Sequence, residues 1–429
     1  MAIYLFETRQ LRERFSPLTA NKSILELLAG GITIRDWWLD ENRGVHNLSL
    51  ITEAFLSQYY DTEIEYLNPG DCLIFAGYRP VAEAGLFKLF FDDPFRLGIG
   101  LLGGMEGKQG NREVLAVRLK EKLSIDAVRK AIFENADPNE ALRILLAQQE
   151  IQWEQASFYS YFHHPEDLLK NLGNHIENAA ECKRGYYDDL GYLTIPLHPS
   201  NQVWGKHKVM VEEGAQVHFS TFNTENGPIY IGKDAQIMEG CLIRGPFFLG
   251  EKATLKMGTK IYGPVATGPK VVLGGEIKNC IFHEGTNKGH DGYLGDSIIG
   301  AFCNFGAGSG GSNVKNTGGN VRLYDQDLKE FREVGQKFGA VMGDYTRIGV
   351  GTQLTTGSYI GLCCNLFGLE MPPKHVAAFS WGTGDHLSDY QLEKALEHID
   401  NWLQFKGCSL DKREIQILNH IFEQTRRQG

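Results

Sequence analysis

The chain has 429 residues, a formal net charge of -10 and a sequence pI near 5.8. Such an acidic surface argues against nucleic acid and anionic membranes as general partners, because both carry dense negative charge. Mean hydropathy is -0.27, and the sequence contains neither a secretory leader nor an apolar run of membrane-spanning length. These features predict a cytoplasmic protein of two or three domains. Its eight cysteines show no CxxC spacing and no paired clusters, so they are expected to be reduced.

The N-terminal part is expected to form an α/β layer of the kind that binds nucleotides. Residues 2–6 predict a short buried strand, and the polar residues 7–14 predict a loop. The apolar residues Ile24, Leu25 and Leu28 then have helical spacing. A second buried strand is expected over residues 71–76. A strand, a loop and a helix in this order are typical of nucleotide-binding domains.

The end of this first domain is marked by helices and a linker. Ser124 is expected to cap one helix and Pro165 to open another. Pro196 and Pro199 indicate a linker. We therefore predict an α/β domain over residues 1–200, a repeat domain over residues 201–372 and a helical segment over residues 373–429.

Bulky aliphatic residues recur every sixth position in two stretches of the second half, at Ile231, Ile237, Ile243, Leu249, Leu255 and Ile261, and again at Met342, Ile348, Leu354, Ile360 and Leu366. This period fits neither a helix nor a simple alternating strand. It fits triangular coils of three short strands, each of which contributes one inward side chain. Stacked coils bury a continuous apolar column that no single coil could bury. The spacing therefore predicts a parallel β-helix from about Val209.

The repeat is interrupted between residues 281 and 293 and between residues 306 and 341. Interruptions of a solenoid are usually loops on one face, where ligands often bind. Beyond residue 373 the pattern becomes helical, and two amphipathic helices are expected to close the open end of the stack. The adjacent Cys363 and Cys364 should face opposite sides of a strand, so that only one lies inside.

The first interruption carries a specific motif. Residues 287–296 read Asn-Lys-Gly-His-Asp-Gly-Tyr-Leu-Gly-Asp, and residues 304–308 read Asn-Phe-Gly-Ala-Gly. With these residues the chain resembles the bifunctional N-acetylglucosamine-1-phosphate uridylyltransferase and glucosamine-1-phosphate acetyltransferase family. It looks closest to a sugar nucleotidyltransferase branch, which has counterparts of residues 15–30, 227–263 and 373–382. The resemblance covers nearly the whole chain.

The resemblance implies a nucleotidyltransferase-like N-terminal domain, a left-handed parallel β-helix, and a homotrimer with acetyl-coenzyme A sites between subunits. It also implies that His290 is the general base, which takes a proton from the sugar amine as the amine attacks the thioester. Imidazole suits this role because its ordinary pKa lies near the working pH. Spacing alone leaves the alternative of a loop histidine that makes a backbone hydrogen bond.

Further residues receive roles by the same resemblance. Asn304 is expected to assist catalysis by orienting the substrate, and Tyr293 and Asn313 are expected to contact the sugar or its phosphate. Gly306, Ala307 and Gly308 are expected to bind acetyl-coenzyme A, with their backbone amides stabilising the oxyanion. The substrates implied are a sugar phosphate or a nucleotide-sugar, together with acetyl-coenzyme A as the acyl donor.

Spacing gives a separate argument for Lys260 and Lys278. They are 18 residues apart, which is one regular coil, so both ammonium groups are expected to project into one groove. Two stacked cations on an acidic protein favour a bound anion. The resemblance implies that this anion is the sugar phosphate or nucleotide-sugar. Two solvated lysines on a flat face are the alternative.

The N-terminal domain departs from the pattern of active nucleotidyltransferases. Residues 7–14 lack the glycines of the usual phosphate-binding loop. Arg14 and Lys22 are the expected cations for phosphate, and Asp71 is a candidate ligand for Mg²⁺, with a turn-capping role as its alternative. Nucleotidyl transfer needs cations and a metal to offset phosphate charge. Only part of that set is visible.

Two other functions stay open at this point. The chain can be a nucleotide-sugar-binding or regulatory protein whose nucleotidyltransferase site has decayed. Coils of this period also carry zinc in carbonic anhydrases, where three histidines come from neighbouring subunits. His283 and His290 are the only histidines near the interrupted region, and no third partner has suitable spacing.

Overall fold

The computed structural model describes residues 2–41, 48–60, 64–77, 97–103, 113–155, 161–190 and 195–427. These residues form two compact units. Unit 1 lies within residues 1–14, 22–26 and 35–164, and unit 2 lies within residues 15–21, 27–34 and 165–429. The domain boundaries at residues 200 and 372 stay predictions. The compact unit that contains the repeat begins at Pro165 and includes two short N-terminal segments.

Unit 1 is an α/β fold, as predicted. Its six-stranded sheet has the order β2-β1-β4-β6-β5-β8, in which β6 is antiparallel to both of its neighbours. The strands are β1 (Ile3–Phe6), β2 (Leu48–Ile51), β4 (Cys72–Phe75), β5 (Ile99–Gly103), β6 (Glu113–Arg118) and β8 (Gln152–Gln155), with β3 (Tyr66–Leu67) and β7 (Leu123–Ser124) forming a separate pair. The helices are α1 (Arg9–Phe15), α2 (Ile34–Glu41), α3 (Ala54–Ser57), α5 (Ile125–Phe133) and α6 (Pro138–Leu146). The buried strands predicted at residues 2–6 and 71–76 are confirmed.

Three local predictions in this region are wrong. The polar residues expected to form a loop fold into helix α1, and the expected helix around Leu25 is only one 3₁₀ turn, Ile24–Glu26. The buried Glu7 carboxylate explains the second difference, because it accepts hydrogen bonds from the Ser23 hydroxyl at 2.8 Å and from the Ile24 amide at 3.1 Å and so holds this turn close to β1. Ser124 precedes α5 as expected, but its side chain makes no capping hydrogen bond.

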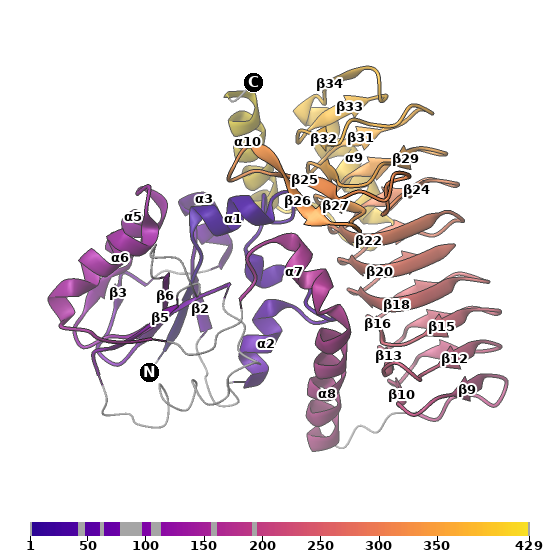
Figure 1. Cartoon of the computed structure of the whole chain (residues 1–429), viewed down its shortest axis with the longest axis horizontal. Coiled ribbons are helices and arrows are strands. Elements are labelled where there is room, and N and C mark those ends of the chain that lie inside the picture. The colour runs from indigo at the N-terminus through magenta and orange to yellow at the C-terminus, as the bar shows by residue number, and fades with distance from the viewer. Residues whose placement is uncertain are drawn as a thin grey trace. The chain divides into compact units, whose positions relative to one another are not determined.

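Unit 2 contains the predicted left-handed parallel β-helix, which Figure 1 shows as a stack of short strands from β9 to β34. One sheet follows the order β10 (Val209–Val211), β13 (Ile229–Ile231), β16 (Phe247–Leu249), β18 (Lys260–Thr267), β20 (Glu276–Phe282), β22 (Tyr293–Ile299), β27 (Ala340–Met342), β30 (Ser358–Ile360) and β32 (His375–Val376). Off this path the same sheet includes β9 (Gln202–Trp204), β12 (Thr221–Asn223), β15 (Leu242–Arg244), β24 (Gly310–Gly311) and β29 (Gln353–Leu354). We call this the first sheet.

The second sheet follows the order β11 (Gln216–Val217), β14 (Gln236–Ile237), β17 (Thr254–Leu255), β19 (Val272–Leu273), β21 (Asn287–Lys288), β23 (Asn304–Phe305), β28 (Arg347–Ile348), β31 (Asn365–Leu366), β33 (Ser380–Gly382) and β34 (Leu387–Asp389). All neighbours pair in parallel except β33 and β34. Helices α7 (Pro165–Lys170), α8 (Leu172–Leu190), α9 (Leu392–Gln404) and α10 (Lys412–Arg427) complete the unit.

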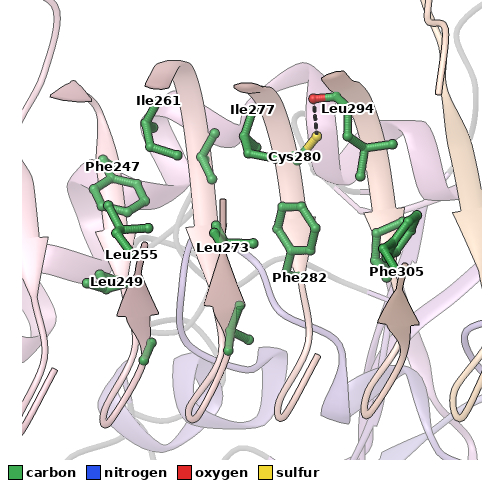
Figure 2. Close-up of a cluster of buried hydrophobic side chains, with 14 of the residues drawn as sticks. Phe247, Leu249, Leu255, Ile261, Leu273, Ile277, Cys280, Phe282, Leu294 and Phe305 are labelled. Carbon is green, nitrogen blue, oxygen red and sulfur yellow. Dashed lines mark hydrogen bonds between the residues drawn. The ribbon is translucent and has the colours of Figure 1, made fainter. Parts of the chain in front are cut away.

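The aliphatic residues of the six-residue repeat form the core of the β-helix, as predicted. All eleven predicted positions, from Ile231 to Ile261 and from Met342 to Leu366, are buried in one continuous cluster. Figure 2 shows the middle of this column, where Leu255, Leu273 and Phe282 point into the interior of the stack. Burying a side chain of this size stabilises the folded state by about 1.5–3 kcal/mol. The column is therefore the main source of stability in unit 2.

The first interruption is not a loop. Regular coils contain 18 residues, since Ile243 pairs with Ile261, but Ile261 pairs with Ile277 only 16 residues later. A register shift after Tyr262 shortens this coil, and β21 still pairs with β19 and β23. The second interruption does contain an insertion, the antiparallel hairpin β25 (Val321–Asp325) and β26 (Glu330–Gly335).

The C-terminal helices cover the side of the coils, whereas we expected them to close the end of the stack. Lys406, just beyond α9, donates hydrogen bonds to the Lys270 carbonyl at 2.9 Å and to the Asn287 side chain at 2.7 Å. This cover also explains why both Cys363 and Cys364 are buried, although only one of them lies inside the coils, as predicted. Cys364 lies in the core column, and Cys363 lines a cavity shared with α9.

Candidate active site on the β-helix

His290 lies at the corner between β21 of the second sheet and β22 of the first sheet, and it is exposed. The ammonium group of Lys288 donates a hydrogen bond of 2.6 Å to the His290 carbonyl oxygen. Lys288 is fully buried at an inward position of the coil, next to Leu273, and burial lowers the pKa of Lys288 to about 8. A buried lysine therefore holds the corner from inside while His290 remains at the surface.

The outward face of β18, β20 and β22 carries polar residues next to this corner. Glu276 of β20 pairs with Lys260 of β18 on one side and with Tyr293 of β22 on the other. The Tyr262 hydroxyl donates a hydrogen bond to the Glu276 carboxylate, and this bond raises the pKa of Tyr262 to about 12. Burial raises the pKa of Tyr293 as well. Both phenols are therefore neutral donors at ordinary pH.

The prediction that Lys260 and Lys278 occupy equivalent places on successive coils is wrong. Lys260 pairs with Glu276, and Lys278 pairs with Tyr262, because the coil between them is shortened. The two lysines are still on the same face of the sheet, because Lys278 lies two positions after Glu276, the partner of Lys260, and side chains two positions apart on a strand point to the same side. The two lysines therefore lie diagonally across the pair of strands, and Glu276 and Tyr262 take the other two positions. The Lys278 ammonium lies 5.8 Å from the centre of the Tyr262 ring.

Asn313 and Tyr293 are brought together at Gly295. A Cβ atom at Gly295 would lie 2.2 Å from the Tyr293 hydroxyl and 3.0 Å from the Asn313 amide nitrogen, so a larger residue there would displace these side chains. The Asn313 amide donates to the buried Asp296 carboxylate, which also accepts a 2.5 Å hydrogen bond from Asn279. These bonds fix the Asn313 amide at the edge of the polar face.

Asn304 lies elsewhere. It belongs to β23 in the second sheet, where it pairs with Asn287 and Arg347, whereas Tyr293 is in the first sheet. The structure therefore does not place Asn304 on the polar face that carries Tyr293. The motif puts the two residues close in sequence, but a corner of the coil separates their strands.

The glycine-rich corner of residues 306–308 is equivalent, one coil later, to the corner that carries His290, since Asn287 pairs with Asn304. The Gly306 amide donates a 2.8 Å hydrogen bond to the Ile348 carbonyl of the next coil. The expectation that this amide stabilises an oxyanion is therefore wrong for Gly306. Gly308 has a φ of +70° and open space at its Cβ position, so this corner leaves room at the surface. A role for Ala307 and Gly308 stays a prediction.

The candidate phosphate-binding residues of unit 1 do not form the expected site. Arg14 lies in α1. Burial raises the pKa of Glu113, and the positive charge of Arg14 partly opposes this rise. Lys22 gives its carbonyl to the Arg12 guanidinium at 2.9 Å. The Asp71 carboxylate accepts hydrogen bonds from the Ala2 amide at 2.8 Å and the Asn68 amide at 2.9 Å. These bonds fit the turn-capping alternative for Asp71, and the described residues contain no group of three potential metal ligands.

A buried ion pair at the end of β1 was missed from the sequence. The Arg12 guanidinium donates to the Glu7 carboxylate at 2.9 Å, and Thr52 and Ser23 donate to the same carboxylate. An acidic residue directly after a buried strand, with arginine five positions later, was the available signal. Two members of this network belong to residues 7–14, the stretch that lacks the glycines of the usual phosphate-binding loop.

His283 has a structural role. The Leu28 amide donates to its Nε2 at 3.1 Å, so the proton is on Nδ1, which donates to the Ile299 carbonyl at 2.9 Å. Both ring nitrogens are thus hydrogen-bonded, so His283 is not a candidate zinc ligand and only His290 remains of the two histidines considered for a zinc site. Across the described ranges, no helix is both long and apolar enough to cross a membrane.

Comparisons with known proteins agree with the predicted resemblance. Residues 3–83 match the family model described as sugar nucleotidyl transferase. The bifunctional protein GlmU of Methanococcus maripaludis is 36% identical over 97 residues, which cover 21% of this chain and 23% of that protein. The bifunctional protein GlmU of Methanocaldococcus jannaschii is 33% identical over 90 residues, which cover 21% of each chain. The matches thus span about a fifth of the length of these relatives, and over that part they confirm the predicted resemblance.

Two solved structures also match the chain. LpxA, a UDP-N-acetylglucosamine acyltransferase from Bacteroides fragilis, is 12% identical, and the match covers 52% of this chain and 96% of LpxA with a TM-score of 0.24. The polySia specific acetyltransferase NeuO is 10% identical, and the match covers 45% of this chain and 86% of NeuO with a TM-score of 0.26. These scores are too low to support an argument about this chain.

Proposed function

We propose that this chain is a transferase of nucleotide-sugar synthesis whose β-helix acetylates an amino-sugar phosphate with acetyl-coenzyme A. The observation that carries the proposal is the exposed His290 at a corner beside the polar face of Lys278, Tyr293 and Asn313. The partial similarity of the chain to bifunctional GlmU proteins supports the same reaction. An accessible imidazole beside cations and neutral donors suits a sugar phosphate substrate.

In this mechanism His290 accepts a proton from the sugar amine as the amine nitrogen attacks the thioester carbonyl. The C–N bond forms, the C–S bond breaks, and the coenzyme A thiolate leaves and takes up a proton. Lys260 and Lys278 attract the phosphate, while Tyr293 and Asn313 donate hydrogen bonds to the sugar or its phosphate. Asn304 has no part in this version, because its strand belongs to the other sheet.

Assembly and location are part of the proposal. The corner of residues 307–308 is open at the surface, which supports an acetyl-coenzyme A site completed by a neighbouring copy in a homotrimer. Acetyl-coenzyme A and nucleotide-sugars are metabolites of the cytoplasm, so the enzyme would act there.

A second candidate concerns unit 1, whose match to sugar nucleotidyl transferases supports nucleotidyl transfer with Mg²⁺. The described residues do not fit that metal, because both Asp71 oxygens accept backbone hydrogen bonds and residues 9–15 form helix α1 in place of a phosphate-binding loop. This observation favours a unit that binds a nucleotide or nucleotide-sugar, or regulates the chain, without turnover.

Two parallel assays test the proposal. Acetyl transfer is followed as release of the free coenzyme A thiol with glucosamine-1-phosphate, and nucleotidyl transfer as release of pyrophosphate from UTP with a sugar-1-phosphate and MgCl₂. We expect thiol release that depends on the amino sugar. Calorimetric titration with UTP and UDP-sugars separates binding from turnover in unit 1. Thiol release at the background rate with every amino-sugar phosphate tested would refute the acetyltransferase proposal.

A further inference from the structure

A cavity of about 240 Å³ lies in unit 2 between the outward face of the second sheet and helix α9. Arg347, Asn365 and Trp381 are paired in register on β28, β31 and β33, so they form one row along this face. Asn401 and Trp402 of α9 line the opposite wall. The cavity is thus built entirely from one compact unit and involves none of the residues assigned to acetyl transfer.

Arg347 supplies an uncompensated positive charge to this cavity. Its Nη1 donates to the Phe302 carbonyl, but its Nη2 is buried and has no hydrogen-bond partner among the described residues. The guanidinium carbon lies 5.0 Å from the centre of the Trp402 ring, and within the described part of the chain no carboxylate forms an ion pair with Arg347. A buried guanidinium is costly unless an anion or a full set of acceptors satisfies it.

The remaining walls are largely aromatic. The Trp381 and Tyr390 rings lie 4.7 Å apart, and the Tyr390 hydroxyl is hydrogen-bonded to Nδ1 of His398 at 2.5 Å. Burial raises the pKa of Tyr390 and of the Cys363 thiol, so neither adds negative charge at neutral pH. Flat apolar rings together with one unsatisfied guanidinium favour a ligand that has a planar face and an anionic end.

We propose that this cavity binds a small planar organic carboxylate, with its carboxylate on Nη2 of Arg347 and its ring against Trp402 and Trp381. The volume suits a ligand of one ring, because an apolar cavity of about 150 Å³ is already large enough to bind benzene. Since α9 forms one wall, such a ligand would hold α9 against the coils. This site does not depend on the acetyltransferase proposal, because it lies on the other sheet.

Benzoate and its neutral analogue benzamide are suitable probes, titrated into the full-length protein with calorimetry and tryptophan fluorescence as readouts. We expect benzoate to bind and to quench tryptophan fluorescence, and benzamide to bind at least about tenfold more weakly, because a charge-assisted bond to arginine is lost. Arg347→Met should weaken benzoate binding by a similar factor. Arg426→Met is the matched control, since Arg426 also lies over a ring, that of Phe422, but on the exposed side of α10.

Three results would overturn the proposal: no benzoate binding at millimolar concentration, equal affinity for benzoate and benzamide, or undiminished binding by Arg347→Met. Binding of inorganic phosphate as tight as that of benzoate would contradict the planar ligand. Circular dichroism shows whether Arg347→Met folds. If it does not, the ratio of benzoate to benzamide affinity in the unmodified protein decides the matter alone.

Discussion

Lys288 offers a prediction whose size follows from the structure. It takes an inward position of the coil, next to Leu273, where the other coils mostly place an apolar side chain. Its ammonium group donates a hydrogen bond to the His290 carbonyl, and burial lowers the pKa of Lys288 from 10.5 to about 8. Replacement by methionine keeps the length of the side chain and removes its charge.

The sign of the pH effect follows from the lowered pKa. Between about pH 8 and pH 10.5 the unfolded chain keeps a proton that the folded chain has lost, so the free energy of unfolding rises with pH in this window. At about 1.4 kcal/mol per pH unit, the rise from pH 8 to pH 10 is at most about 2.7 kcal/mol. Below pH 8 the lysine is charged in both states, and the cost of burying it is partly offset by about 1.5–3 kcal/mol from its charged hydrogen bond.

We therefore expect Lys288→Met to be close to neutral or slightly stabilising at pH 7 and to abolish this rise. Calorimetric melting of both proteins between pH 7 and pH 10 tests the expectation, with the exposed Lys260→Met as control. The difference in Tm between the unmodified protein and Lys288→Met should increase by roughly 5–10 °C from pH 8 to pH 10. Parallel Tm curves for the two proteins would refute the reasoning.

Three further predictions concern packing and ion pairs. Leu273→Ala should lower the free energy of unfolding of the β-helix by about 2–5 kcal/mol, measured by chemical denaturation, because it opens a cavity in the column. Glu166→Ala removes both bonds of a carboxylate to Arg332 on hairpin strand β26, at 2.5 and 2.8 Å, so amide exchange of that hairpin should accelerate while exchange of the core strands is unchanged. Glu7→Ala removes the nearer of two carboxylates from the buried Arg12 guanidinium, since Glu53 lies 3.9 Å away, and should destabilise unit 1 by about 3–5 kcal/mol, visible as a lower Tm. Unchanged hairpin exchange or an unchanged Tm would contradict these assignments.

The β-helix could be predicted because its period directly encodes which side chains point inward. Each aliphatic residue from Ile231 to Ile261 takes the core position that the spacing assigned to it. The next coils were not predictable by the same rule, because a register shift after Tyr262 shortens them and the inward positions then include Lys288. This shift also separated Lys260 from Lys278, which the 18-residue period had placed side by side.

The candidate site could be predicted where the residues of a sequence motif lie on the same face of the β-helix. His290 lies at the expected corner and Tyr293 on the strand that follows it, but Asn304 belongs to a strand of the other sheet. Backbone hydrogen bonds are also invisible in a sequence, so the engagement of the Gly306 amide could not be foreseen. Arg347 was missed for a related reason. It precedes the inward Ile348, and its Nη2 is buried where α9 places Trp402 against the guanidinium.

The measurement that tests the central claim most directly is acetyl transfer by His290→Asn. Rates of coenzyme A release with glucosamine-1-phosphate are compared with those of the unmodified protein, and acetyl-coenzyme A affinity is measured separately by calorimetry. We expect turnover to fall by about 10²–10⁴-fold, the usual contribution of a general base, while the affinity for acetyl-coenzyme A is retained. Unchanged turnover in His290→Asn would show that the imidazole takes no proton and that the proposed mechanism is wrong.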